Sequence, residues 1–244
     1  MRERILGQPI DIISMKEAHY IVTMALANKR QLKIITLNPE MIIISRTKLE
    51  FQSAINSSDL IVPDGTGIVW GLKLRDIKDA ERIPGIELAE KILDSANKLE
   101  KKLAVFGGEQ LVLDGAVGYF KKNYPNIEIV ASINGYEPKE KESEIAKELS
   151  SCNPDIVLVA LGTPRQEIWI NKYSNLFPKS IMIGIGGSLD VWSGKKQRAP
   201  IWMREKNLEW LHRVISEPKR TLRILKSLPL YVFLVLKEKF CNDS

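Results

Sequence analysis

A short acidic and glycine-rich segment has the composition of a catalytic loop. After the apolar run 60–62 the chain reads Pro63-Asp64-Gly65-Thr66-Gly67. A carboxylate at the end of a strand is well placed to act as a general base, and glycines let a substrate approach the backbone. An Asp-Gly turn with Thr66 as a helix N-cap would have the same sequence, so the spacing alone leaves both interpretations open.

A second candidate segment follows the apolar run 156–161 and reads Gly162-Thr163-Pro164-Arg165-Gln166-Glu167. Thr163, Pro164 and Gln166 predict a capping box with proline at the first helical position. The free N–H groups and positive dipole end of such a helix suit a phosphate. If the cap does not use Gln166, its side chain is available to a ligand.

The segment after 32–37 contains Thr36, Asn38 and Pro39. A helix start with Asn38 as N-cap and Pro39 at the first helical position accounts for both residues without any ligand. Thr36, at the end of the strand, remains as a possible ligand contact.

Two glycine-rich segments also follow apolar runs: Gly107-Gly108, and 184–188 ahead of Asp190. Neither has the sequence of a P-loop or the full dinucleotide fingerprint. Together on one edge of a sheet, they would allow the backbone to approach a nucleotide closely.

The chain contains no Asp-x-Asp, and its only histidines are His19 and His212. His19 falls in a predicted helix and is expected to be a core or surface residue. A metal-held diphosphate or a catalytic histidine is therefore hard to build, and cations or helix termini must stabilise a phosphate leaving group. The candidate cations are Arg82, Arg213, Arg220 and Arg223.

These segments need a parallel sheet to position them. Ile-, Val- and Leu-rich runs alternate with helical patterns, which predicts an α/β fold with a Rossmann-like, mostly parallel sheet flanked by helices. The predicted strands are 32–37, 60–62, 103–106, 127–131, 156–161 and 181–185. The predicted helices are 15–29, 39–46, 66–74, 86–100, 110–123 and 139–150.

The pattern changes near residue 194, after which the sequence is basic and helix-compatible. Residues 216–218 predict a helix end followed by a new start with Ser216 as N-cap, and Pro229 introduces the apolar run 230–236. We therefore divide the chain into an α/β catalytic domain, 1–194, and a helical basic appendage, 195–244.

The net charge of +6 is concentrated between residues 195 and 226, where ten basic and three acidic residues give +7 and leave −1 elsewhere. Such a block indicates a polyanionic partner: a phospholipid surface, a nucleic acid or a diphosphate. A merely solvated basic face is the alternative. No apolar run is long enough to span a bilayer, no targeting signal is evident, and two distant cysteines favour a reducing compartment.

Taken together, the segments resemble the WecG/TagA/CpsF family, glycosyltransferase family 26. The similarity extends in order along nearly the whole chain. It is carried by 36–38, 63–67, 81–85, 106–108, 161–167, 184–187, 198–200 and 208–213.

The resemblance implies an inverting glycosyltransferase without metal or other cofactor. Family members transfer N-acetylmannosamine (ManNAc), or its uronic acid, from UDP to N-acetylglucosamine (GlcNAc) on undecaprenyl diphosphate. The first donor serves wall teichoic acid linkage-unit synthesis, and the second serves surface antigen synthesis. The Lys- and Ile-rich composition favours the teichoic acid branch and therefore UDP-ManNAc.

In this interpretation Asp64 deprotonates the 4-hydroxyl of the acceptor sugar, while Thr36 and Gln166 position the sugars. The residues expected on the nucleotide side are Gly107, Gly108, Gly135, Tyr136, Gly162, Gly187 and Asp190. Those expected at the substrate diphosphates are Asn38, Arg82, Arg213, Arg220 and Arg223.

The appendage is expected to dock on anionic lipid and to complete the active site, which places the protein in the cytoplasm at the inner membrane face. Packing on the sheet domain, or between subunits of a homo-oligomer, is the alternative.

Two other functions fit the sequence less well. A nucleotide-dependent oxidoreductase should carry a full dinucleotide fingerprint, which this chain lacks. A nucleic-acid-binding module would not explain the carboxylate and glycines at the strand ends, so we expect no nucleic-acid partner.

Overall fold

The computed structural model describes residues 1–206, 208–216 and 218–242, with side chains except at 205, 213, 215–226 and 242. Its centre is a six-stranded, all-parallel sheet in the order β4-β3-β8-β7-β5-β6. The strands are β3 (Leu32–Leu37), β4 (Leu60–Pro63), β5 (Lys102–Gly107), β6 (Glu128–Ile133), β7 (Ile156–Ala160) and β8 (Ile181–Gly184). This arrangement confirms the predicted fold class and all six predicted strands.

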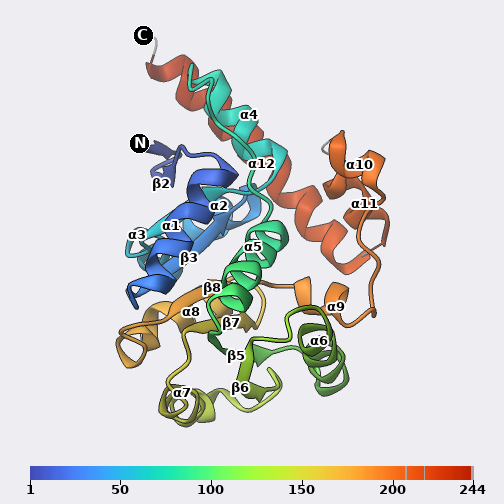
Figure 1. Cartoon of the computed structure of the whole chain (residues 1–244). Coiled ribbons are helices and arrows are strands. Elements are labelled where there is room, and N and C mark those ends of the chain that lie inside the picture. The colour runs from blue at the N-terminus through green and yellow to red at the C-terminus, as the bar shows by residue number, and fades with distance from the viewer. Residues whose placement is uncertain (207, 217, 243–244) are drawn as a thin grey trace.

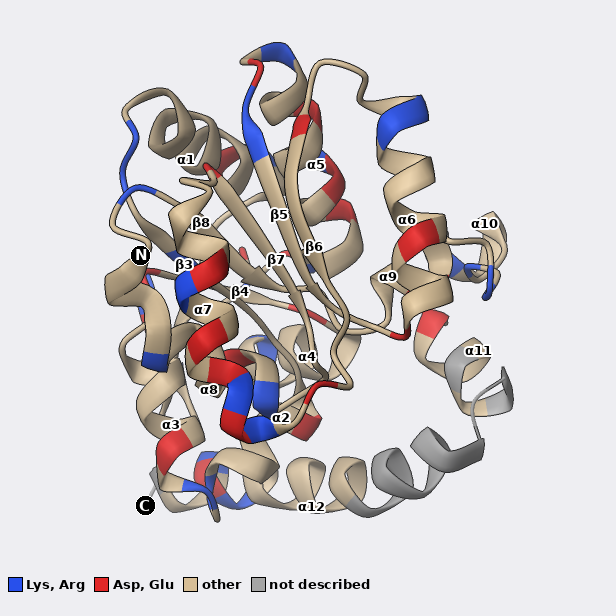
Figure 2. Ribbon diagram, turned by 90° about the horizontal axis from the view of Figure 1, so that it is seen from below, with Lys and Arg blue, Asp and Glu red and all other residues tan. Residues whose placement is uncertain are grey.

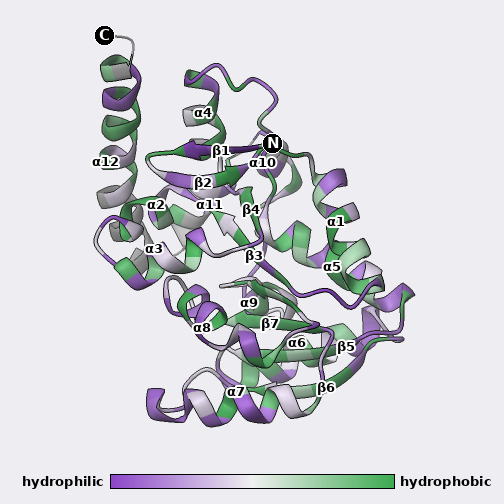
Figure 3. Ribbon diagram, turned by 90° about the vertical axis from the view of Figure 1, so that its left-hand side faces the viewer, coloured by the Kyte–Doolittle hydropathy of each residue, from purple (hydrophilic) through white to green (hydrophobic). Residues whose placement is uncertain are grey.

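Each central strand is buried on both faces. Leu103 and Val105 of β5 belong to one hydrophobic cluster, whereas Ala104 and Phe106 belong to another on the opposite face. This alternation follows from the two-residue period of side chains along a strand. Figure 3 shows β5 and β7 coloured mainly as hydrophobic, and Figure 2 shows the middle of the sheet almost free of charged residues.

Helices cover both faces of the sheet (Figure 1). The first cluster contains residues of α1, α5, α6 and α9, and the second contains residues of α7 and α8. The helices up to residue 192 are α1 (Met15–Ala27), α2 (Pro39–Ser45), α3 (Leu49–Asn56), α4 (Thr66–Leu74), α5 (Gly85–Lys98), α6 (Gln110–Asn123), α7 (Glu142–Ser151), α8 (Arg165–Tyr173) and α9 (Ser188–Trp192). Two 3-10 turns, η1 (Lys139–Lys141) and η2 (Ser174–Leu176), complete this part.

An N-terminal hairpin and α3 were not predicted. The hairpin pairs β1 (Arg2–Ile5) with β2 (Gln8–Asp11), and its turn residues Leu6 and Gly7 both have positive φ. Its strands are only four residues long, and Leu at a left-handed turn position is not a turn signal. The Asp11 carboxylate accepts hydrogen bonds from Arg2 and from the Ile61 N–H of β4, both at 2.8 Å, which attaches the hairpin to the edge of the sheet.

The helix starts agree only in part with the prediction. Asn38 caps α2 as predicted, by accepting a hydrogen bond from the Met41 N–H. Thr66 is not an N-cap, because Gly65, with φ of 92°, holds that position. The predicted capping box of Thr163 and Gln166 is also wrong: α8 begins at Arg165 without a side-chain cap, and both polar side chains bind Glu167 instead.

The helices in the described part of the C-terminal segment are α10 (Ile201–Glu205), α11 (Glu209–Ser216) and α12 (Pro218–Asn242). The predicted helix end at 216 and new start at 218 are confirmed, whereas the predicted N-cap role of Ser216 lies outside the described side chains. Pro229, which precedes the apolar run 230–236, lies inside α12, and the helix continues through it despite the missing N–H. No described helix is both long and apolar enough to cross a membrane.

The second half of α12 belongs to a hydrophobic core. Figure 1 shows α12 beside α4, and its Tyr231 and Val235 are fully buried in a third cluster with residues of the hairpin, α2, α3 and α4. The Tyr231 hydroxyl donates to the Gly67 carbonyl oxygen at 3.1 Å, directly after the Asp64-Gly65 turn. The appendage is therefore anchored at the start of α4, the helix that follows the Asp64-Gly65 turn.

This anchoring predicts that Tyr231→Ala will destabilise the whole protein. Loss of a fully buried aromatic ring should lower the free energy of unfolding by about 3–5 kcal/mol, and Tyr231→Phe, which removes only the hydroxyl, by about 1 kcal/mol. Urea denaturation would measure both values. Phe233→Ala is the matched control, because Phe233 is 61% exposed on the same helix. Equal stability of Tyr231→Ala and Phe233→Ala would show that α12 does not pack on the core.

Candidate functional site

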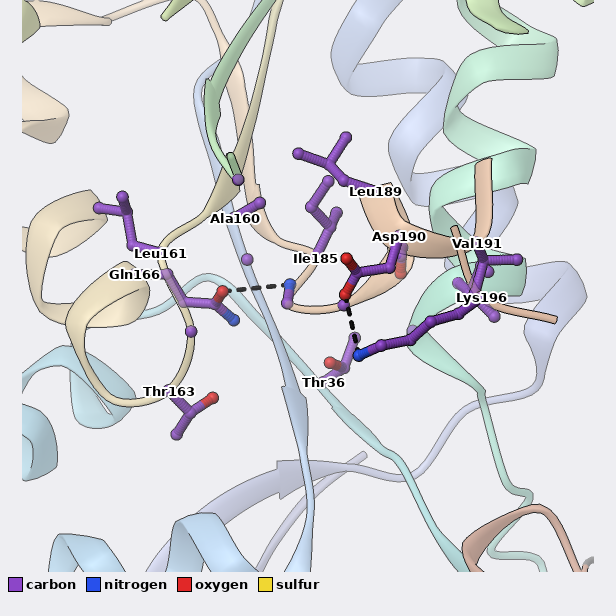
Figure 4. A pocket seen from close by; sticks show the side chains of 18 of the residues that line it. Thr36, Ala160, Leu161, Thr163, Gln166, Ile185, Leu189, Asp190, Val191 and Lys196 are labelled. Atoms are coloured by element: carbon purple, nitrogen blue, oxygen red, sulfur yellow. Dashed lines mark hydrogen bonds and ion pairs between the residues drawn. The ribbon is translucent and has the colours of Figure 1, made fainter. Parts of the chain in front are cut away.

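The loops at the carboxyl ends of the parallel strands surround one cleft of about 1090 Å³. Ligands bind at this edge in open α/β sheets. The residues labelled in Figure 4 line it from β3, from the end of β7 and from the segments that follow β7 and β8. Of the predicted site residues, the cleft is lined by Thr36, Asn38, Asp64, Gly108, Gly135, Tyr136, Gly162, Gln166, Gly187 and Asp190.

Asp64 and Thr36 lie at one corner of the cleft. The Asp64 N–H donates to the Leu37 carbonyl at 2.8 Å, which joins the ends of β4 and β3. The Gly85 N–H donates to Asp64 Oδ2 at 3.4 Å, so the carboxylate faces the positive end of α5. A Cβ at Gly85 would lie 3.0 Å from Thr36 Oγ1. This close approach brings the Thr36 hydroxyl and the Asp64 carboxylate to the same helix terminus.

Gln166 and Glu167 form a buried polar network in the wall, each only 4% exposed. Gln166 Nε2 donates to Glu167 Oε1 at 2.7 Å, and Thr163 Oγ1 donates to the same oxygen at 3.1 Å. Gln166 Oε1 accepts from the Gly186 N–H at 3.1 Å (Figure 4). Burial raises the pKa of Glu167 to about 7, against the smaller effect of these hydrogen bonds.

The predicted glycines serve two different purposes. Gly108 and Gly135 line the cleft and are joined by a hydrogen bond from the Gly135 N–H to the Gly108 carbonyl at 2.9 Å. Gly107 is not among the residues that line it. A Cβ at Gly107 would lie 2.4 Å from the backbone of Ala160, so this glycine allows β5 and β7 to pack closely.

Tyr136 and Asp190 also line the cleft. Tyr136 is 75% exposed, and its hydroxyl donates weakly to Glu109 at 3.5 Å. Asp190 forms an ion pair with Lys196 at 3.1 Å, and Glu109 forms one with Lys195 at 2.6 Å (Figure 4 shows the first pair). An exposed aromatic ring beside polar groups is suited to stacking on a nucleobase.

Several basic residues that line the cleft were not predicted as site residues from the sequence. The segment Lys195–Arg198 borders it and is attached to three separate elements through Glu109, Asp190 and Glu87. Arg165 also lines it, donating to Glu142 and to the Gly135 carbonyl. Arg165 and Arg198 lie within motifs noted in the sequence, and Lys195 and Lys196 lie in its basic block, but their spacing alone did not indicate which of them would line the cleft.

Arg82 reaches the cleft through Glu209, the first residue of α11. Arg82 Nη2 lies 2.5 Å from Glu209 Oε2, and Arg198 Nε lies 3.6 Å from Glu209 Oε1. Glu209 lines the cleft, whereas Arg82 is not among its lining residues. The side chains of Arg213, Arg220 and Arg223 fall outside the described part of the structure.

The described wall of the cleft carries more negative than positive charge. Arg165, Lys195, Lys196 and Arg198 are its described basic residues. Its acidic residues are Glu40, Asp64, Glu109, Glu137, Glu167, Asp190 and Glu209. Any polyanionic ligand therefore needs further cations beside this wall.

Comparison with known proteins gives a consistent assignment. Residues 3–244 match the model of the glycosyl transferase WecG/TagA/CpsF family. The chain is 39% identical to a Bacillus subtilis (strain 168) protein over 93% of this chain and 86% of that protein. It is 35% identical to a Staphylococcus aureus (strain MW2) protein over 96% and 92%.

Both relatives are named N-acetylglucosaminyldiphosphoundecaprenol N-acetyl-beta-D-mannosaminyltransferase. The similarity covers the sheet, the cleft loops and the C-terminal helices alike. The chain therefore belongs to the WecG/TagA/CpsF family of glycosyl transferases.

Proposed function

We propose that this protein transfers ManNAc from UDP-ManNAc to the 4-hydroxyl of GlcNAc on undecaprenyl diphosphate, the reaction that builds the linkage unit of wall teichoic acid. The observation that carries the proposal is the full-length similarity to two proteins named for this transfer, combined with a carboxylate, Asp64, at the cleft corner.

The proposed reaction inverts the anomeric configuration. Asp64 takes the proton from the acceptor 4-hydroxyl as its oxygen attacks the anomeric carbon from the face opposite UDP. The new glycosidic bond has β configuration, and the bond to the UDP oxygen breaks with its electron pair. Thr36, beside Asp64 at the N-terminal end of α5, positions the acceptor sugar, and Gln166 positions the donor sugar.

Cations supplied from beyond the described wall stabilise the leaving diphosphate in this proposal. Because the described wall has seven acidic and four basic residues, it cannot neutralise two diphosphates alone. We assign this role to Arg82 and to the appendage residues Arg213, Arg220 and Arg223, with Asn38 nearby and with no resident metal. Arg82 would then exchange the carboxylate of Glu209 for a phosphate.

The nucleotide is placed against the loops after β5, β6, β7 and β8. Gly108, Gly135, Gly162 and Gly187 let the backbone approach it, Tyr136 stacks on the uracil, and Asp190 binds a ribose hydroxyl. Gly107 supports this site from beneath by allowing β5 to approach β7.

The charge of the cleft favours the donor whose sugar is uncharged. A ManNAc uronic acid would bring a further carboxylate into a wall that already has an acidic excess, and the like charges would repel each other. UDP-ManNAc avoids this cost, which supports the teichoic acid branch over surface antigen synthesis.

We further propose that the appendage, 195–244, docks on the anionic inner face of the cell membrane. Its exposed apolar side chains include Ile201 and Trp202 on α10 and Phe233 and Phe240 on α12. Aromatic and aliphatic side chains of this kind insert into the interfacial region, and the surrounding basic residues attract anionic lipid. Docking would bring the lipid-linked acceptor to the α10–α11 side of the cleft.

The general-base assignment predicts that Asp64→Asn lowers the rate of UDP release by about 10²–10⁴-fold, since an amide cannot accept the proton. UDP release from UDP-ManNAc is measured with and without the lipid-diphosphate-linked GlcNAc acceptor, in EDTA. Asp114→Asn, an exposed acid on α6, is the control and should retain full activity. Near-normal activity of Asp64→Asn would contradict the assignment, and loss of all activity in EDTA would contradict a metal-free reaction.

Membrane docking predicts that the full-length protein co-sediments with anionic vesicles more than with neutral ones, and less at high salt. Trp202→Ala with Phe233→Ala should weaken this binding, whereas Leu111→Ala, an 85% exposed residue of α6, should not. A truncation at residue 194 is unsuitable, because it would remove the buried Tyr231 and Val235. Equal sedimentation of all variants would contradict docking through these helices.

A further inference from the structure

The side-chain amide of Gln166 is held in one orientation by two groups of opposite kind. The Gly186 N–H can only donate, and it binds Oε1 of the amide at 3.1 Å. The Glu167 carboxylate, when ionised, can only accept, and it binds Nε2 at 2.7 Å. A flipped amide would oppose donor to donor and acceptor to acceptor, so these partners permit a single orientation.

The amide also lies directly against the backbone of β8. A Cβ at Gly184 would lie 2.5 Å from Gln166 Nε2 and 2.8 Å from Cδ, so the amide occupies the space that a side chain would fill. An amide nitrogen carries two hydrogens, and Glu167 accepts only one. Within the described residues, the second N–H has no hydrogen-bond acceptor, and Gln166 lines the cleft.

We infer that Glu167 is a positioning residue for Gln166: its carboxylate holds the amide so that the second N–H is presented to an oxygen of the bound sugar. The inference deepens the proposed function and rests on it. The ligand group would be a hydroxyl or the acetamido carbonyl of the donor sugar. Both are acceptors that an amide N–H binds without any charge, which suits a neutral sugar.

The burial of Glu167 is difficult to explain as a purely structural feature. Its Oε2 atom is buried without a hydrogen-bond partner, and desolvation raises the pKa of the carboxyl group. A group whose folded-state pKa is raised costs stability at every pH above its unfolded value. A neutral side chain of similar size should therefore make the fold more stable. A residue that is costly to bury and that orients a cleft side chain is expected to serve the reaction.

The test compares two substitutions of Glu167. Glu167→Gln retains an acceptor oxygen at the same reach, so kcat should stay within about threefold of the wild-type value. Glu167→Met removes the acceptor, so kcat should fall about tenfold or more, the value of one hydrogen bond to a charged group. Neither substitution should lower the melting temperature at pH 8. A merely structural role would instead reduce stability and kcat together.

Gly184→Ala gives an independent route to the same amide, because the added methyl group takes its place. It should lower kcat as Glu167→Met does, and combining the two should add little. Gly118→Ala on α6 is the control, since a Cβ there has nothing within 4 Å. In a Gln166→Ala background, Glu167→Met should have no further effect on kcat.

Three results would overturn the inference. Equal losses in Glu167→Gln and Glu167→Met would mean that the carboxyl group itself is required. A full additional loss from Glu167→Met in the Gln166→Ala background would mean that Glu167 does not act through Gln166. If Gln166→Ala had wild-type kcat, Glu167 could not act by positioning Gln166. The proposed function would still stand in each of these cases if Asp64→Asn abolished transfer.

Discussion

The parallel alignment of all six strands is the constraint on which the rest of the structure depends. Parallel strands must all end at one edge of the sheet, so six separate strand-to-helix loops are brought around a single cleft. No loop supplies a complete site by itself. Thr36 comes from the end of β3, Asp64 from the loop after β4 and Gln166 from the start of α8, and the sheet rather than any local motif brings them to one cleft.

This constraint also explains which features could be predicted from sequence. Strands buried on both faces are nearly continuous in Ile, Val and Leu, so their positions and the loops after them were predictable. Side-chain partners within a loop were not. Thr163 and Gln166 have the spacing of a capping box, but both side chains donate hydrogen bonds to the buried Glu167 carboxylate instead of capping α8. Asn38 has no such competitor and caps α2 as predicted.

The role of the C-terminal segment was the other feature that periodicity could not resolve. Its basic composition indicated an appendage with a polyanionic partner, whereas α12 is also part of a core. Tyr231 packs against α4. Its hydroxyl donates to the Gly67 carbonyl, and a Cβ at Gly71 would lie 2.6 Å from the same hydroxyl. Gly71 and Tyr231 lie 160 residues apart in the sequence and are complementary only in three dimensions, so neither residue alone indicates the contact.

The appendage is thus connected to the catalytic domain at two distant places. Tyr231 and Val235 fix α12 in an apolar cluster, and Glu209 fixes the start of α11 through Arg82 and Arg198. The first contact is apolar and independent of ligand, whereas the second consists of ion pairs whose cations a diphosphate can also satisfy. In the proposed reaction, a phosphate that binds Arg82 and Arg198 would displace the Glu209 carboxylate, and substrate binding would then be coupled to the placement of α11 through the same two guanidinium groups.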